Sequence, residues 1–289
     1  MKSFEFRFYK DNDEKESKRC DTVTYSDSIE AFTLSDSNSD VLGLRTNFHE
    51  LISGLKLQYI DETVLDDYLH KLPKNKLNGI DTFGAVLTQE DVKPGLVEGG
   101  FTLWDGSKDL VNYISEHFLE KIYGKNVLEL GCGCGLPGIL ALKTGARLVR
   151  FQDYNSEVLK WWTIPNVIIN LEPEDFVVSH KEHAHLEFFS GDWLRLSQIW
   201  QLTTNVKFDY IFTSETIYRP DLYERLHKIL ETSLCQTGVV LLACKASYGP
   251  GGNMFDWVNY VQNLGMFQTT ISKITTTGAI RYIIEMSRT

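Results

Sequence analysis

The stretch "NVLELGCGCGLPGI", residues Asn126 to Ile139, decides the fold of this chain. It begins with an apolar run that ends at Leu130, and glycines follow at positions 131, 133, 135 and 138. A proline at position 137 suits the first turn of a helix, where its missing N–H is not needed. The stretch therefore predicts a strand, a glycine-rich turn and a helix, an arrangement that holds nucleotide-like ligands in α/β proteins.

Strands and helices alternate along the chain after this point, which is typical of a parallel, doubly wound sheet. Only four residues, 275–278, join the last two strands, so these two should pair as an antiparallel hairpin. The prediction is an α/β fold with a doubly wound, seven-stranded, mostly parallel sheet and an antiparallel C-terminal hairpin. The expected strands are 126–130, 148–153, 186–190, 208–213, 239–245, 268–274 and 279–286, and the expected helices are 105–123, 137–144, 156–170, 220–233 and 253–264.

The N-terminal region differs in composition from the rest of the chain. Of the 289 residues with a net charge of −10, residues 1–67 carry 8 Lys and Arg against 15 Asp and Glu, whereas the remaining residues are nearly balanced. Residues 15–40 are polar and lack a period, although a short helix is expected over 64–72. We therefore predict an acidic, partly disordered arm over residues 1–90 and one folded domain over residues 91–289.

Composition also limits the partners and the compartment. An acidic protein repels phosphate backbones, so we expect no direct binding of nucleic acid. The sequence has neither an apolar run long enough for a membrane span nor an apolar signal segment at its start, so we expect no membrane partner and a cytoplasmic and nuclear location. The five cysteines are expected to be reduced thiols, and the protein is expected to be a monomer.

The residues of the glycine turn exclude two classes of nucleotide loop. A Walker loop ends in Gly-Lys-Ser/Thr, whereas this one ends in Leu136-Pro137-Gly138. A dinucleotide fingerprint that starts at Gly131 needs its third glycine at position 136, which is leucine here. Glu129, two residues before the first glycine, would in addition be poorly placed beside a pyrophosphate.

Acidic residues at three successive strand ends favour S-adenosylmethionine as the cofactor. Glu129 suits the positive α-amino group of this phosphate-free ligand, and Asp153 can accept both ribose hydroxyl hydrogens. Asp192 and Trp193 suit the adenine amino group and ring face. The alternative for Asp153 and Asp192 is a helix N-cap, and for Glu129 a structural role.

Residues from about 94 to the C-terminus resemble the seven-strand, S-adenosylmethionine-dependent methyltransferases and, within them, the histidine protein methyltransferase family. The segments that carry the resemblance are "KPGLVEGGFTLWDGSKDLV", "VLELGCGCGLPGI", "VRFQDYNSEVL", "TIPNVIIN", "FSGDW" and "FDYIFTSETIYRP". The resemblance implies a Rossmann-like class I methyltransferase fold and, as substrate, a histidine of a basic protein of the large ribosomal subunit. Related lysine methyltransferases usually carry Asp-x-x-Tyr after the fourth strand, and Glu215 with Tyr218 here favours the histidine branch.

The resemblance also implies a set of site residues. The expected catalytic residues are Glu215 and Tyr218, and we expect no metal site, because His180, His183 and His185 lie in a polar insert. The expected cofactor-binding residues are Trp104, Asp105, Gly106, Ser107, Glu129, Gly131, Gly133, Gln152, Asp153, Tyr154, Gly191, Asp192, Trp193 and Ser214.

The chemistry of methyl transfer explains these roles. A histidine is mostly neutral at pH 7, so the enzyme needs no strong base; it must hold a bare ring nitrogen near the methyl group. An acceptor for the other ring N–H, Glu215 or Tyr218, would select that tautomer. Plain packing is the alternative for Tyr218 and Trp104. A lysine methyltransferase of the same fold, and a non-catalytic cofactor-binding escort of a basic protein, remain alternative functions.

Overall fold

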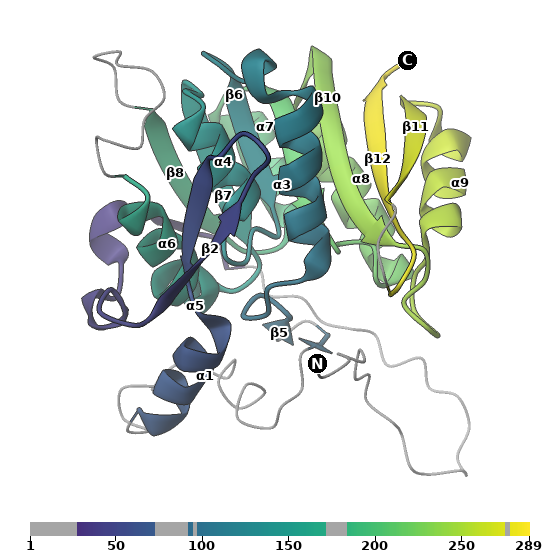
Figure 1. The fold of residues 1–289 in the computed structure, drawn as a ribbon. Coiled ribbons are helices and arrows are strands. Elements are labelled where there is room, and N and C mark those ends of the chain that lie inside the picture. Colours follow the sequence, from purple (N-terminus) through teal and green to yellow (C-terminus); the bar gives the residue numbers. More distant parts are fainter. Residues whose placement is uncertain (1–27, 73–91, 95–96, 172–183, 275–277) are drawn as a thin grey trace.

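The computed structural model describes residues 28–72, 92–94, 97–171, 184–274 and 278–289. Its central sheet has the strand order β1-β8-β7-β6-β9-β10-β12-β11 (Figure 1). Strands β6 to β10 run parallel, whereas β1 and β12 are antiparallel to their neighbours. The strands are β1 (Glu30–Phe32), β6 (Asn126–Leu130), β7 (Leu148–Asp153), β8 (His185–Ser190), β9 (Phe208–Ser214), β10 (Leu234–Lys245), β11 (Phe267–Ile274) and β12 (Arg281–Arg288).

Helices cover both faces of the sheet because its strands bury both sets of side chains. In β6, Val127 belongs to the apolar cluster under α3, α4 and α6, and Leu128 belongs to the cluster under α7, α8 and α9. The helices of the domain are α3 (Asp105–His117), α4 (Leu136–Lys143), α5 (Ser156–Val158), α6 (Ile164–Ile169), α7 (Trp193–Thr203), α8 (Tyr223–Ser233) and α9 (Met254–Leu264). Short η4 (Leu119–Lys121) and η7 (Pro220–Leu222) are 3-10 turns, and a π turn, η5 (Leu159–Thr163), joins α5 to α6.

All seven predicted strands are present, and the C-terminal hairpin of β11 and β12 is confirmed. The prediction missed the edge strand β1, which pairs with β8. It also missed helix α7, although Asp192 caps its N-terminus and Leu196 and Trp200 repeat at helical spacing. The expected helix over 105–123 was too long, because α3 ends at His117 and a 3-10 turn follows.

The N-terminal region contains described elements that pack on the domain. These are η1 (Leu34–Asp36), η2 (Ser39–Val41), the antiparallel pair β2 (Thr46–Glu50) and β3 (Lys56–Ile60), and helix α1 (Glu62–Lys71). The predicted short helix is confirmed by α1. The expectation of a loosely held segment over 15–40 is wrong for residues 30–32, whose backbone is paired in the sheet, while residues 15–27 lie outside the described residues. Polarity alone did not reveal this pairing, because strand β1 contributes only one buried side chain, Phe32.

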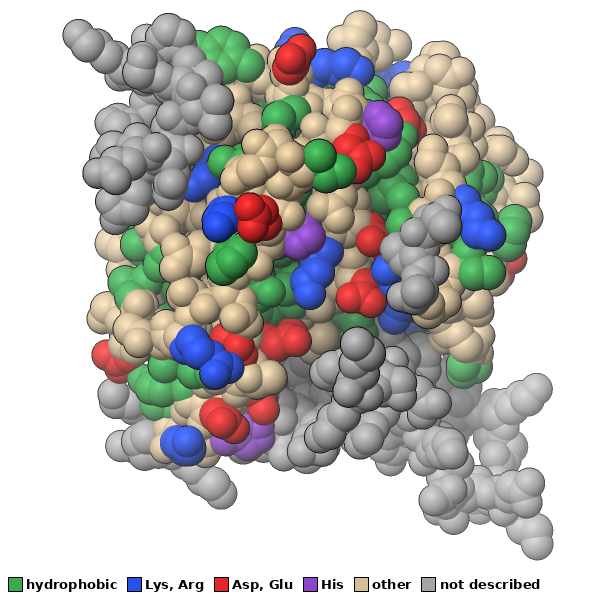
Figure 2. Space-filling view, viewed as in Figure 1, with side chains coloured by type: hydrophobic (Ala, Val, Ile, Leu, Met, Phe, Trp, Pro, Cys, Tyr) green, Lys and Arg blue, Asp and Glu red, His purple; other side chains and the backbone are tan. Residues whose placement is uncertain are grey.

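The surface in Figure 2 shows acidic and basic side chains mixed over the visible face of the domain, without a broad patch of one sign. Among the described helices, none combines the length and the apolar content that crossing a membrane requires.

Candidate active site

A pocket opens at the carboxyl ends of β6, β7, β8 and β9, where ligands collect in open α/β sheets. Its volume is about 740 Å³, including the part open to solvent. Glu98, at the end of the short strand β5 (Val97–Glu98) that pairs with β4 (Val92–Lys93), also lines the pocket, as do most residues of the segment 99–104. Of the predicted site residues, Trp104, Ser107, Gly131, Gly133, Asp153, Tyr154, Gly191, Asp192, Trp193, Ser214, Glu215 and Tyr218 line the pocket, whereas Asp105, Gly106, Glu129 and Gln152 do not.

The glycine turn needs glycine at the two positions that face the pocket. Gly131 and Gly133 have φ angles of 60° and 51°, which side chains rarely adopt. A Cβ at position 131 would lie 2.9 Å from Thr216 Cγ2, and one at position 133 would lie 3.2 Å from the carbonyl oxygen of Gly100. The turn therefore offers its backbone to a ligand at close range.

Two predicted residues support this turn from behind. Glu129 is buried, and its Oε2 accepts a hydrogen bond from the N–H of Gly138 at 2.7 Å, at the start of α4. Gln152 accepts from the Gly131 N–H at 3.3 Å and from Trp193 Nε1 at 2.7 Å, and its amide donates to the carbonyl of Gly191. Both side chains therefore hold the walls of the pocket without lining it.

The segment "TIPNVIIN" supplies supports that the sequence analysis did not assign to the site. Thr163 Oγ1 donates to the carbonyl of Gly133 at 2.5 Å, and Asn166 Nδ2 donates to that of Cys134 at 3.0 Å. Thr163 closes the π turn η5, a local irregularity that often marks functional positions. Two polar residues in an otherwise apolar helix were the sign of this role in the sequence. The carbonyl groups that they contact, however, lie 30 and 32 residues earlier in the chain.

Asp153 and Asp192 both line the pocket. Asp153 accepts hydrogen bonds from the N–H groups of Gly133 and Asn155, and burial raises the pKa of this carboxyl to about 6. Asp192 caps α7 by accepting from the N–H groups of Leu194 and Arg195, so the alternative of an N-cap is confirmed for this residue. It still lines the pocket, and it also pairs with Arg225 at 2.8 Å.

Glu215 occupies an unusual position. Its φ angle of 58° lies in the left-handed region, and its residue surface is 5% exposed. Oε2 accepts from the Tyr248 hydroxyl at 2.6 Å, whereas Oε1 is buried against Gly106 and has no hydrogen-bond partner among the described residues. Burial raises the pKa of Glu215, and the positive charge of Lys245 opposes this rise. The carboxylate is thus turned toward α3 and Tyr248.

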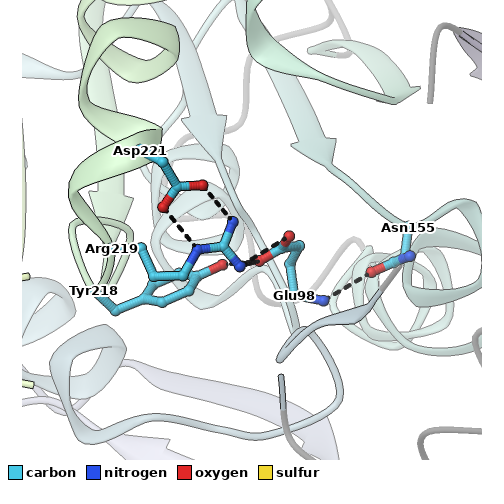
Figure 3. A network of polar contacts seen from close by, with 5 residues as sticks. All are labelled: Glu98, Asn155, Tyr218, Arg219 and Asp221. Atoms are coloured by element: carbon cyan, nitrogen blue, oxygen red, sulfur yellow. Dashed lines mark hydrogen bonds and ion pairs between the residues drawn. The ribbon is translucent and has the colours of Figure 1, made fainter. Parts of the chain in front are cut away.

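Tyr218 belongs to a polar network with Glu98, Arg219, Asp221 and Asn155 (Figure 3). Its hydroxyl donates to Oε2 of Glu98, which Arg219 also contacts at 3.3 Å. Arg219 in turn pairs with Asp221, and the backbone N–H of Glu98 donates to Asn155. The sequence analysis missed Glu98, because no local pattern links it to Tyr218, 120 residues further on.

The remaining predicted residues lie around the start of α3. Trp104 donates through Nε1 to the carbonyl of Gly99 at 3.1 Å, and the ammonium of Lys245 lies 5.1 Å from the centre of its ring. Asp105 is largely exposed and pairs with Arg281 at 3.2 Å. Trp104 is therefore a wall of the pocket, while Asp105 faces away from it.

Comparison with known proteins agrees with this geometry. The chain is similar to the histidine protein methyltransferase 1 homologs of Mus musculus, with 37% identity over 69% of this chain and 59% of the relative, and of Dictyostelium discoideum, with 40% identity over 60% and 52%. The expected resemblance to this group is thus confirmed, and the chain spans less than two thirds of the length of these relatives.

The fold is shared with solved structures. The magnesium protoporphyrin IX methyltransferase of Synechocystis PCC 6803, solved with bound S-adenosylhomocysteine, matches with a TM-score of 0.50 and 14% identity over 79% of this chain and 99% of that one. This likeness supports the class I methyltransferase fold. The model of one family, described as "Lysine methyltransferase", matches residues 88–259, more than half of the chain, and the chain belongs to that family.

Proposed function

We propose that this chain is an S-adenosylmethionine-dependent protein-histidine N-methyltransferase. The observation that carries the proposal is the pocket in which the glycine turn, Asp153 and Tyr218 face one another at the carboxyl edge of the sheet. The curated relatives named for histidine methylation support histidine as the target.

The residues present fit the cofactor. Gly131 and Gly133 form a cradle that a Cβ would fill, Asp153 brings a carboxylate suited to the ribose hydroxyls, and Trp193 offers a ring beside the adenine position. The turn lacks the Walker lysine, as a phosphate-free ligand requires. When bound, the cofactor supplies an electrophilic methyl group on its sulfonium.

The protein's own task is to position the acceptor. An imidazole has a pKa of about 6.5 and is mostly neutral at pH 7, so the site must exclude water, orient the ring and accept its N–H. Glu215 and Tyr218 stay the proposed residues for this role, and Trp104 encloses the same space.

We extend the proposal to the substrate and the setting. The substrate is a basic protein, namely one of the large ribosomal subunit, and the enzyme acts as a monomer in the cytoplasm and nucleus without binding nucleic acid directly. Lysine methylation is the second candidate, because the family as a whole is described by that activity. Glu215 in place of the aspartate common in lysine enzymes favours histidine.

The test is incubation of the protein with labelled cofactor and a ribosomal extract, followed by acid hydrolysis and separation of the methylated amino acids. We expect labelled methylhistidine, and no label with Gly131→Arg, whose side chain would fill the cradle. Methyllysine would replace the histidine assignment by the lysine one. Cofactor binding without any labelled product, in an extract not previously methylated, would favour the escort function.

A further inference from the structure

The hydroxyl of Tyr218 has a single proton, and the hydrogen-bond partner of the hydroxyl decides where this proton points. That proton is donated to Glu98, because an ionised carboxylate can only accept. Toward any further group the phenolic oxygen can therefore act only as an acceptor. Tyr218 is one of the residues that line the pocket.

The charge of Glu98 is maintained by its surroundings. Its side chain is about nine tenths buried, and the Arg219 guanidinium contacts both carboxylate oxygens, at 3.5 and 3.3 Å. Asp221 holds the other side of Arg219 with two hydrogen bonds at 3.1 Å, so the guanidinium is fixed in place. Asn155 accepts from the backbone N–H of Glu98 at 3.3 Å and so holds the backbone of this residue (Figure 3).

Glu215, the other proposed acceptor, is arranged differently. One of its carboxylate oxygens is occupied by Tyr248, and the other is covered by Gly106 at the first turn of α3. A substrate N–H would reach this carboxylate only after the Glu215 side chain had turned away from Tyr248 and Gly106. The bond from Tyr218 to Glu98, in contrast, gives the phenolic oxygen the role of an acceptor.

We propose that Tyr218 accepts the N–H of the substrate imidazole and that Glu98 is the positioning residue that makes it an acceptor. The inference rests on the proposed histidine methylation and explains which ring nitrogen of the substrate would receive the methyl group. With the N–H held by Tyr218, only the other ring nitrogen carries a lone pair toward the methyl group. The product is therefore a single methylhistidine regioisomer.

The test compares the turnover and the methylhistidine isomers of purified wild-type protein, Tyr218→Phe and Glu98→Ala on a ribosomal protein substrate. Tyr218→Phe removes the acceptor, so we expect turnover to fall about tenfold, the value of one hydrogen bond of about 1.4 kcal/mol, and both isomers to form. Glu98→Ala removes the carboxylate that accepts the phenolic proton, so the phenol can donate to the substrate. A donor at this place would leave the ring N–H facing the methyl group, so we expect turnover to fall at least as far as in Tyr218→Phe.

Tyr113→Phe is the matched control. Tyr113 also donates its hydroxyl to a glutamate, Glu285, but neither residue lines the pocket. This variant and Glu215→Gln should each keep the wild-type isomer, whatever their rates. Binding of S-adenosylhomocysteine, followed by thermal shift, shows which variants are folded.

The results separate the two levels of the argument. A wild-type product other than methylhistidine overturns the proposed function itself. An unchanged single isomer from Tyr218→Phe, together with wild-type turnover of Glu98→Ala, overturns the role of Tyr218 and Glu98 and leaves the function standing. Loss of isomer selection in Glu215→Gln alone assigns the acceptor to Glu215.

Discussion

At the scale of single residues, the proposed role of Asp153 predicts that cofactor binding depends on pH. Burial raises the pKa of its carboxyl to about 6, and the ionised form is the better acceptor for two ribose hydroxyls. Affinity should therefore be full above pH 6 and fall as the pH drops through 6, by about tenfold at pH 5. Calorimetric titration with S-adenosylhomocysteine between pH 5 and 7 measures this dependence.

Two other acids lie near this carboxyl, Glu98 and Glu129, and a variant separates their contributions. Asp153→Asn should bind more weakly than wild type at pH 7 and show little change down to pH 5, because the titrating group is gone. If the affinity of this variant falls with decreasing pH as it does in wild type, the pH dependence belongs to Glu98 or Glu129.

At the scale of secondary structure elements, helix α6 connects the glycine turn to strand β3. Asn166 accepts from the Ile60 N–H at 2.8 Å and donates to Cys134 in the turn, whereas Asn170 bonds both the N–H and the carbonyl of Gln58. Both asparagines are buried, and alanine at either position removes two hydrogen bonds to the backbone of another segment. Each substitution should lower the free energy of unfolding by about 2 to 4 kcal/mol.

The two variants should differ in cofactor binding. Only Asn166 touches the glycine turn, so Asn166→Ala should weaken S-adenosylhomocysteine binding several-fold, while Asn170→Ala keeps the wild-type affinity at a temperature where both are folded. Denaturant titration and calorimetry give the two quantities. Equal affinities would show that the turn holds its shape without support from α6.

At the scale of the whole molecule, the proposed division at residue 90 can be tested by truncation. The N-terminal elements bury Leu57, Ile60, Leu65 and Leu69 in the cluster that also contains the apolar residues of α3 and α4. Glu62 in α1 accepts at 2.6 Å from the N–H of Leu103, which lines the pocket. Removal of residues 1–90 should therefore expose an apolar face and lower the melting temperature markedly.

A single substitution provides the graded version of this experiment. Leu65→Ala in the full chain should cost about 2 to 5 kcal/mol of unfolding free energy, as expected for a fully buried leucine. Both measurements use thermal and denaturant unfolding. A fragment 91–289 that unfolds at the same temperature as the full chain would instead establish the N-terminal region as a separate, dispensable arm.

The sequence by itself determined the fold class and the glycine turn at which the pocket lies. Residues 126–153 indicate both features, because a buried strand, closely spaced glycines and an acid at the end of the next strand follow one another along the chain. Packing of both faces against helices follows from the nearly continuous apolar runs of the parallel strands. These features depend on neighbours along the chain, which periodicity and turn chemistry describe.

Tertiary structure alone decided which polar groups meet. Glu98 reaches Tyr218, Asn166 reaches the glycine turn, and Glu215 turns to Tyr248 across 33 positions of the chain. It also placed the N-terminal strands and helix against the core, although their sequence is polar and acidic on average. Such contacts depend on side-chain directions and burial in three dimensions, because a buried hydrogen-bonding group takes its partner from whatever the fold brings beside it.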